Sequence, residues 1–484
     1  MSSNPLLLPD LLQPISRYIE PEDVYNCCLV SKTWYDAFNP LLWRTVIINN
    51  RNRPLLISAR THHIRKLVFQ GSTLPNYLPT QWSRLEILNI QDNSCSTILN
   101  PLWSSVAEII RESPTLTTIQ LHSFQGELAI EVWESIKNAP NVHTLRLESV
   151  EFNTQQANML WSICTVLENL ELHACMIPNP QESAADDLRN LPVAFPRMHE
   201  IKFVGLKDIP MDQQFLLLQK CPKIRSVCWH GRRVNLFMIN NTFPFDTSFL
   251  ELESLDVKGL TQNNEVNDFI AGNKKPLTKL VVQGCSFSER TVDHLKRHFQ
   301  TLKELDIKLC TQVESKDIAM LLQSCPLLTS FKAGLLLASD IRRGETWPDE
   351  LVTLHINIGL QGCNPEVASR RIFECLSKLI LLQELNLSGN KRHDKRRSEP
   401  LLLQLDYGLD KLSTLRCMTR FYFGEEGQTM TMKEGKWIKR HWRILQVIQG
   451  TFNSDLKVNG QIHRLFRDEN KRYLHREQRG LILQ

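Results

Sequence analysis

Most of the chain repeats one short arrangement, in which the first, fourth and sixth of six consecutive positions are apolar. From about residue 62 the arrangement recurs roughly fourteen times, and its central apolar residues, from Leu67 to Leu415, are about 27 residues apart on average. Alternation of this kind over five or six residues predicts a β-strand with one buried face. The segments are 64–69, 85–90, 116–121, 142–147, 167–172, 198–203, 224–229, 252–257, 277–282, 302–307, 328–333, 351–356, 382–387 and 412–417.

Between these strands the apolar period lengthens to that of a helix. Ile318, Leu321, Leu322 and Cys325 fall at i, i+3, i+4 and i+7, and Pro326 then ends the helix before the next strand. Each unit therefore predicts a strand, a turn, a helix and a turn. No unit can bury its own apolar face, so stacked units should form an α/β solenoid with a parallel sheet inside and helices outside. We expect the central leucines to be fully buried, including Leu170, Leu255, Leu280 and Leu305.

A different pattern occupies Leu8–Trp43 and predicts three short helices. Leu12, Ile15 and Ile19 share one face of the first helix, and Ser31 is a suitable N-cap for the third. Pro14 removes a hydrogen bond inside the first helix and predicts a distortion there. Three helices in roughly forty residues cannot bury all this apolar surface among themselves. The remaining apolar surface should face either a partner protein or the following repeats. In the second case the helices would only cap the solenoid.

The order of particular residues in this stretch resembles the F-box: Leu8-Pro9, Asp10, a Glu22-Asp23 turn, Val30-Ser31-Lys32, Trp34 and Leu42-Trp43. With the repeats behind it, the chain resembles F-box proteins with C-terminal leucine-rich repeats. The resemblance implies an F-box at 5–46, a ribonuclease-inhibitor-like horseshoe at 47–423, and a degenerate last unit with a basic cap at 424–484. It also implies an adaptor-binding set, namely Leu8, Pro9, Leu12, Ile15, Ile19, Val30, Trp34, Leu42 and Trp43.

Such proteins are substrate receptors of Skp–cullin–F-box ubiquitin ligases. The resemblance implies that the F-box holds a Skp-type adaptor, and through it a cullin, while the repeats hold a substrate protein. The receptor itself does no covalent chemistry and acts by raising the effective concentration of the substrate near the conjugating enzyme. Two alternatives remain: a Skp-bound scaffold outside any ligase, and a freestanding repeat module whose helices only cap the solenoid.

A column of polar residues follows the central leucine of each repeat and should point away from the helices, because strand side chains alternate. Neighbouring members alternate in charge at two places along the chain. We consider two interpretations: a ladder of exposed ion pairs, each contributing about 0–1 kcal/mol, and a polar track that orients a substrate. The candidate substrate face comprises Arg146, Glu171, Lys202, Asp256, Asp306 and Lys332.

Composition narrows the function without defining it. The chain has 484 residues, 42% of them apolar and 23% charged, with a net charge of +5 that is too small to indicate nucleic-acid binding. No apolar run is long enough for a membrane span. The 13 cysteines are scattered and form no Cys-x-x-Cys pair, which favours reduced thiols in a cytoplasmic or nuclear protein. The run Lys391–Arg397 is a solvated loop, a nuclear-import signal or a patch for an acidic partner.

Catalytic motifs are absent from the sequence. It contains no Gly-rich phosphate loop, no His-Glu-x-x-His and no Gly-x-Ser-x-Gly. Several repeats end in Asn or Cys, among them Cys175, Cys285 and Cys310, and these positions are typical of the turn after a strand. We therefore expect no enzymatic activity, no cofactor and no metal ligand.

Overall fold

The computed structural model describes most of the chain. The described residues are 9–15, 18–19, 21–49, 58–71, 81–91, 101–122, 127–178, 194–207, 214, 217–230, 251–258, 270–284, 287, 289–310, 312–342, 346–388, 399–424 and 428–467. They belong to two compact units, 1–224 and 225–484. Leu8, Cys285 and the basic run Lys391–Arg397 lie outside the described residues.

Three helices open the first unit: α1 (Pro9–Ile15), α2 (Pro21–Cys28) and α3 (Lys32–Leu42). Leu12, Val24, Cys28 and Phe38 form their buried core. Ser31 is the N-cap of α3, as expected, and its side-chain oxygen accepts a hydrogen bond from the backbone N–H of Trp34 at 3.2 Å. The helices are therefore a small folded element with its own core.

The first helix is shorter than the sequence indicated. It ends at Ile15, directly after Pro14, and a turn follows in which the N–H of Tyr18 donates to the carbonyl of Ile15 at 3.0 Å. Proline removes one hydrogen bond of the ladder and clashes with the preceding turn, which weakens a helix of only seven residues, and Tyr18 and Ile19 lie beyond its end. Ile15 and Ile19 nevertheless both pack against the same core. The predicted stripe is thus built from a helix and a turn.

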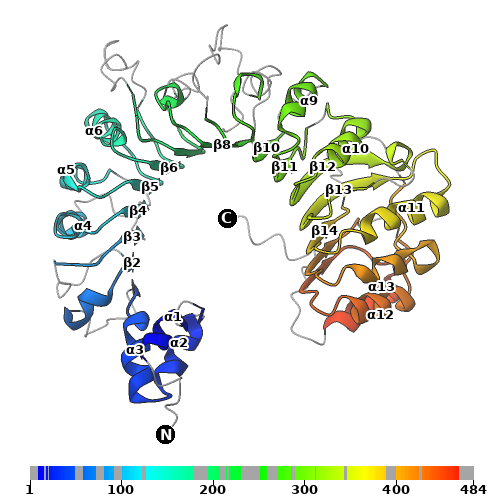
Figure 1. The fold of residues 1–484 in the computed structure, drawn as a ribbon, viewed down its shortest axis with the longest axis horizontal. Helices are drawn as coiled ribbons and strands as arrows, with labels where there is room; N and C mark the ends of the chain where they lie inside the picture. Colours follow the sequence, from blue (N-terminus) through cyan, green and yellow to red (C-terminus); the bar gives the residue numbers. More distant parts are fainter. Residues whose placement is uncertain are drawn as a thin grey trace. The chain divides into compact units, whose positions relative to one another are not determined.

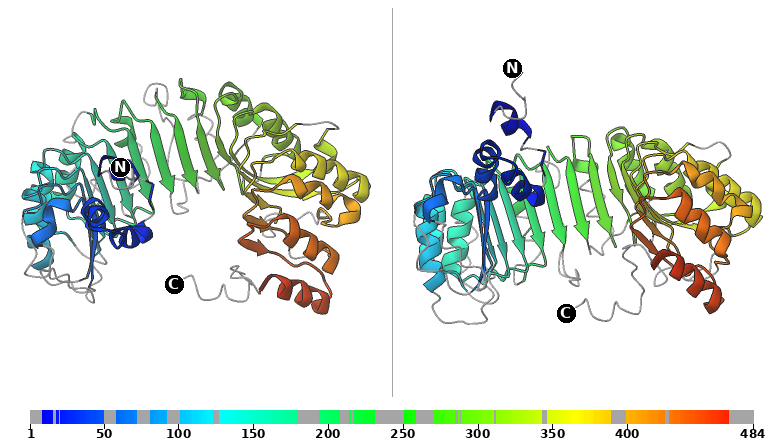
Figure 2. Two further views of the ribbon diagram at one scale, coloured as in Figure 1. Left: turned by 60° about the horizontal axis from the view of Figure 1, so that its bottom comes forward. Right: turned by 90° about the horizontal axis from the view of Figure 1, so that it is seen from below.

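Sixteen strands form one open sheet in chain order, and every strand pairing in the described part is parallel (Figures 1 and 2). The first unit holds β1 (Thr45–Asn49), β2 (Lys66–Gln70), β3 (Ile87–Gln91), β4 (Thr118–His122), β5 (Thr144–Glu148), β6 (Asn169–His173) and β7 (Glu200–Val204). The second holds β8 (Ser226–His230), β9 (Ser254–Lys258), β10 (Lys279–Gln283), β11 (Glu304–Asp306), β12 (Ser330–Leu337), β13 (Thr353–Gly359), β14 (Glu384–Asn386), β15 (Arg420–Tyr422) and β16 (Val447–Gln449).

Helices cover one face of the strands in each unit (Figure 1). They are α4 (Pro101–Arg111), α5 (Ile130–Asn138), α6 (Thr154–Cys164), α9 (Glu289–Leu295), α10 (Ser315–Ser324), α11 (Pro365–Ser377), α12 (Met432–His441) and α13 (Leu456–Arg467). The described connections also contain short 3₁₀ helices: η2 (Ser58–His63), η3 (Lys296–His298), η4 (Ala338–Asp340), η5 (Leu405–Tyr407) and η6 (Leu409–Thr414). We call the other face of the sheet the open face.

The central leucines are buried between the sheet and the helices, which confirms the predicted register. Leu280 and Leu305 are 0% exposed, and Leu170 and Leu255 are 1% exposed. Because side chains alternate along a strand, the residues between them lie on the open face. The cysteines that end two repeats have the expected structural role: the thiols of Cys175 and Cys310 donate to carbonyls of the preceding strand, those of Leu147 and Val282.

One predicted strand is wrong. Residues 412–417 contain no strand, and η6 occupies the first half of this segment. The strand of this repeat is β15, where Phe421 pairs in register with Leu385. Leu409, Leu412 and Leu415 are three residues apart and all buried, so a helical turn produced the same apolar spacing as the strand pattern. Tyr422 consequently follows the central residue of this strand, Phe421.

The C-terminal part contains helix α12, the last strand of the sheet and helix α13. Trp442 is fully buried after α12, and its indole N–H donates to the carbonyl of Leu412 at 3.2 Å. Val447 begins β16, the last strand of the sheet. Helix α13 follows and reaches Arg467, and the rest of the predicted basic cap lies outside the described residues.

The second unit contains a buried histidine, His298, at the end of η3. His298 is 1% exposed, and its Nδ1 accepts a hydrogen bond from the backbone N–H of Leu277 at 3.1 Å. Burial, reinforced by the neighbouring charge of Arg297, lowers the pKa of His298 from 6.5 to about 4. Protonation would place a charge in the core and remove the acceptor.

We predict that the free energy of unfolding falls by up to about 3 kcal/mol from this group as pH drops from 6.5 toward 4. The unfolded state binds the proton first because its histidine pKa is higher, so the stability from neutral His298 is complete above pH 6.5 and is lost below it. His298→Gln keeps an acceptor for Leu277 and should flatten this slope in denaturant titrations. An equal slope in both proteins would contradict the prediction.

Candidate functional site

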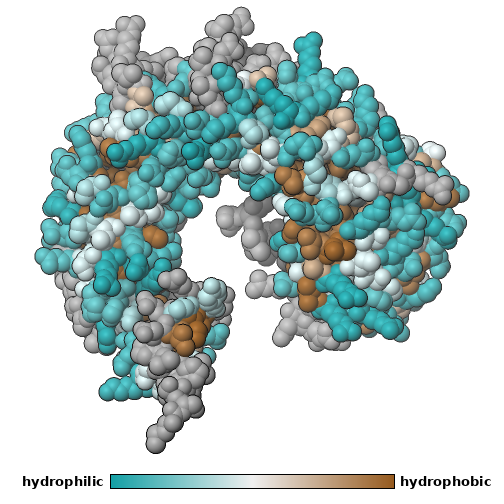
Figure 3. All heavy atoms as spheres, viewed as in Figure 1, coloured by the Kyte–Doolittle hydropathy of each residue, from teal (hydrophilic) through white to brown (hydrophobic). Residues whose placement is uncertain are grey.

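The three N-terminal helices leave large apolar side chains exposed. Leu29 and Val30, in the turn after α2, are 67% and 62% exposed. Others on the same helical element are Leu11, Tyr18, Tyr25 and Tyr35. Figure 3 shows an apolar patch on this part of the surface. A folded element that already has its own core gains nothing from these side chains in water, so they indicate a binding surface.

The predicted adaptor-binding residues divide between this surface and the core beneath it. Val30 is exposed, whereas Leu12 is 0% exposed and belongs to the core. Ile15, Ile19, Trp34 and Leu42 are half-buried and pack against that core. Pro9 begins α1. The structure thus places Val30 where a partner could reach it and gives Leu12 a structural role in the free chain.

The two tryptophans of the motif are both held in place. The ring of Trp34 lies 5.2 Å from that of Phe38, centroid to centroid. The indole N–H of Trp43 donates to the side-chain oxygen of Asn39 at 3.3 Å, and the guanidinium of Arg60 lies 5.9 Å over its ring. Arg60 belongs to η2, so Trp43 links the helical element to the first repeats.

A network of charges lies on the open face of the first unit. Arg146 sits between two carboxylates, with its Nε 3.6 Å from Glu171 and its Nη2 3.6 Å from Glu148. Lys202 Nζ is 3.8 Å from Glu171, and His173 Nε2 is 3.3 Å from the same carboxylate. The predicted alternation of Arg146, Glu171 and Lys202 is therefore present as contacts, in the register of β5, β6 and β7.

These contacts shift the titration of two groups. The hydrogen bond from His173, helped by Lys202 and Arg146, outweighs burial and lowers the pKa of Glu171. Burial lowers the pKa of His122, although Glu148 partly opposes it. At neutral pH the network therefore contains an ionised Glu171 and an uncharged His122. Within the described residues Arg146 makes ion pairs but no hydrogen bond, and its side chain is 34% exposed although its Nε is buried.

The second unit corrects one member of the predicted substrate face. Asp306 is only 2% exposed, because Gln283 donates to its carboxylate at 2.6 Å and the backbone N–H of Lys308 donates at 3.0 Å. Lys332 Nζ lies 3.9 Å away and is half-buried. The sequence pattern identified the face correctly but could not show that a neighbouring glutamine covers the carboxylate. Asp306 is a structural residue, and Lys332 remains accessible.

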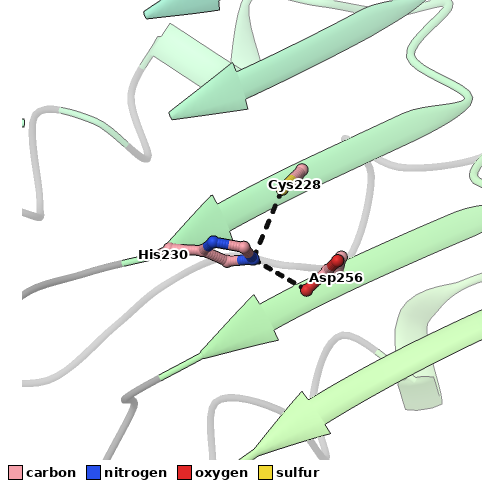
Figure 4. A group of neighbouring side chains, drawn as sticks. All are labelled: Cys228, His230 and Asp256. Carbon is pink, nitrogen blue, oxygen red and sulfur yellow. Dashed lines mark hydrogen bonds and ion pairs between the residues drawn. The ribbon is translucent and has the colours of Figure 1, made fainter. Parts of the chain in front are cut away.

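A group that the sequence analysis missed surrounds Asp256. His230 Nε2 lies 2.9 Å from the Asp256 carboxylate and 3.4 Å from the Cys228 sulfur. Dashed lines mark these two contacts in Figure 4. Burial opposes ionisation of Asp256, but the His230 hydrogen bond and two lysines outweigh it and lower the pKa of that carboxyl. The signal was present in the sequence: Cys228 and His230 are two residues apart on a strand, and Cys228 shares a register position with Asp256.

Comparisons with known proteins agree with the helical element. Residues 9–49 match the F-box-like family. No curated protein matches the chain. Among solved structures, TLR13 in its complex with ssRNA13 is 13% identical with a TM-score of 0.36, over 79% of this chain and 61% of that one. Toll of Drosophila in its complex with Spatzle is 11% identical with a TM-score of 0.40, over 84% and 53%.

The chain spans less than two thirds of either solved protein, and neither likeness is close enough to inform function. The repeats themselves define the class. An F-box-like helical segment is followed by a leucine-rich-repeat solenoid with a parallel, open sheet. This is a protein-interaction architecture, and an F-box-like segment implies a Skp-type adaptor as its general partner. No described helix is both long and apolar enough to cross a lipid bilayer.

We predict that charge reversal at two positions of the open face changes the free energy of unfolding by very different amounts. Glu171→Lys should change the free energy of unfolding by about 1 kcal/mol or less, because the side chain is partly solvated. Asp306→Lys should cost about 3 kcal/mol or more, since it buries a lysine charge beside Lys332 and removes the carboxylate to which Gln283 and Lys308 donate. Denaturant unfolding of the two variants measures the difference. Equal losses would refute the assignment of Asp306 as structural.

Proposed function

We propose that this protein is the substrate-recognition subunit of a Skp–cullin–F-box ubiquitin ligase. The exposed apolar surface on the F-box-like helices carries this proposal, because it is the surface a Skp-type adaptor would cover. The adaptor in turn would connect the chain to a cullin. The protein would work in the cytoplasm or nucleus, and no described cysteine forms a disulfide.

The open face of the solenoid is the proposed site for the substrate protein. It offers charged side chains from successive strands, fixed in position by the parallel register. Arg146 is central to this site in the first unit because its contacts there are ion pairs rather than hydrogen bonds. We propose a receptor that does no covalent chemistry itself and acts by bringing its substrate near a conjugating enzyme.

The same two surfaces would serve a Skp-bound scaffold that never meets a cullin. Reconstitution separates these functions. The full chain, purified with its adaptor, should recruit cullin and support ubiquitin transfer to a bound protein if it is a ligase receptor. Stable adaptor binding without cullin recruitment would favour the scaffold, and no adaptor binding would favour a freestanding repeat module.

We predict that Leu29→Asp with Val30→Asp weakens adaptor binding by at least about thirtyfold, the equivalent of 2 kcal/mol or more. Both side chains are mostly exposed, so the change should spare the fold. Binding of purified adaptor to the full chain is the measurement, with thermal unfolding recorded in parallel.

The chain offers a matched control for this experiment. Ile380 and Leu381 are also adjacent, apolar and exposed, at 56% and 46%, but they follow α11 in the second unit. Ile380→Asp with Leu381→Asp should leave adaptor affinity unchanged. If both double variants bind the adaptor as well as the unaltered chain does, the apolar surface near α2 is not the adaptor site.

We predict that Arg146→Glu removes solenoid-bound proteins while adaptor binding persists. The substitution reverses the charge between two carboxylates on the open face. Arg370→Glu is the control, because Arg370 forms a comparable exposed ion pair with Glu366 on α11. Proximity labelling by the full chain should detect proteins lost with Arg146→Glu and retained with both Arg370→Glu and the Leu29/Val30 variant. Identical labelling by all forms would place the substrate site elsewhere.

A further inference from the structure

Three potential metal ligands of different chemistry meet on the open face of the second unit. The thiol of Cys228 and the imidazole of His230 come from β8, and the carboxylate of Asp256 comes from β9 (Figure 4). Their ligand atoms all lie within 4.8 Å of one another, and each residue is half-buried. This is the only such group among the described residues. Its members are fixed by strand register rather than by a loop.

We propose that Cys228, His230 and Asp256 bind a zinc ion, with a fourth coordination position open on the face of the sheet. The ligand types determine the metal. A thiolate and an imidazole favour Zn²⁺ over magnesium or calcium, which prefer oxygen ligands. Three protein ligands with one open position are a recurrent arrangement for zinc.

The distances suit a tetrahedral ion. Zinc bonds of about 2.3 Å to sulfur and about 2.0–2.2 Å to nitrogen and oxygen give edges of about 3.3 Å between nitrogen and oxygen and about 3.6 Å between sulfur and nitrogen. The corresponding separations are 2.9 Å from His230 to Asp256 and 3.4 Å from His230 to Cys228. The third separation, from the Cys228 sulfur to the Asp256 carboxylate, is no more than 4.8 Å.

The surrounding charges permit a divalent cation. A thiolate and a carboxylate together neutralise Zn²⁺. Lys279 lies near the group, but its ammonium is paired with Glu304 at 2.9 Å. Lys258 Nζ is 3.9 Å from Asp256, and its side chain is 36% exposed, so it can turn into solvent. The alternative is a hydrogen-bonded cluster of the same three residues that binds no ion.

Cobalt substitution tests the proposal on the untagged full chain. After removal of metals with a chelator, titration with Co²⁺ should yield one equivalent with a sulfur-to-cobalt charge-transfer band, and Zn²⁺ should displace it. Cys228→Ser should abolish the band, and Asp256→Asn should weaken binding about tenfold or more, since loss even of an outer-shell group costs about that much. Cys417→Ser, at another half-buried cysteine, should bind Co²⁺ like the unaltered chain.

The outcomes are distinguishable. Absence of a sulfur-to-cobalt band in the unaltered chain would overturn the proposal, as would a band that Cys228→Ser leaves unchanged. Thermal unfolding in the presence of chelator shows whether each variant is folded. If Cys228→Ser were unfolded, the near-isosteric Asp256→Asn and the unaltered chain would still decide the result. The test does not depend on adaptor binding, so its failure is separate from failure of the proposed function.

Discussion

The whole structure depends on the need of each repeat to bury an apolar face that it cannot cover alone. Leu280 is surrounded because Leu255 and Leu305 occupy the same register position on the flanking strands. The same constraint makes the described strand pairings parallel, since a connection that returns over the helical side brings the chain to the next strand in the same direction. It also fixes the open face, because residues that alternate with buried leucines have no other direction to point.

This coupling explains why a single sequence predicts so much of the fold. The strand positions from β2 to β14 follow from the spacing of apolar residues, because burial of one face leaves little freedom in register. The error at 412–417 has the opposite cause. Leu412 and Leu415 are three residues apart both in the strand pattern and in a tight helix, so burial alone does not distinguish the two. The strand of this repeat instead contains Phe421, which pairs with Leu385.

The candidate sites were less predictable, for reasons specific to each. The alternation of side chains along each strand placed Arg146, Glu171 and Lys202 on one face, and the strand register brings them into contact. The apolar pattern could not reveal that Gln283 covers Asp306, because this burial depends on a side chain from the neighbouring strand. Similarly, the F-box motif contains Leu12 and Val30 together, yet one is core and the other is surface. A sequence motif contains both the residues that stabilise the fold and the residues that contact the partner. The structure is needed to tell these two groups apart.

The two proposed surfaces differ in a way that suits different partnerships. The F-box-like helices expose apolar side chains, such as Leu29 and Val30, whose burial is favourable in any geometry that excludes water. Lasting complexes commonly use surfaces of this kind. The open face instead presents ion pairs that are already formed, and a partner must replace them with contacts at least as good. Its contribution is therefore to selectivity more than to raw affinity. Such a division would let the F-box-like helices remain bound to their adaptor while the open face binds and releases substrate proteins.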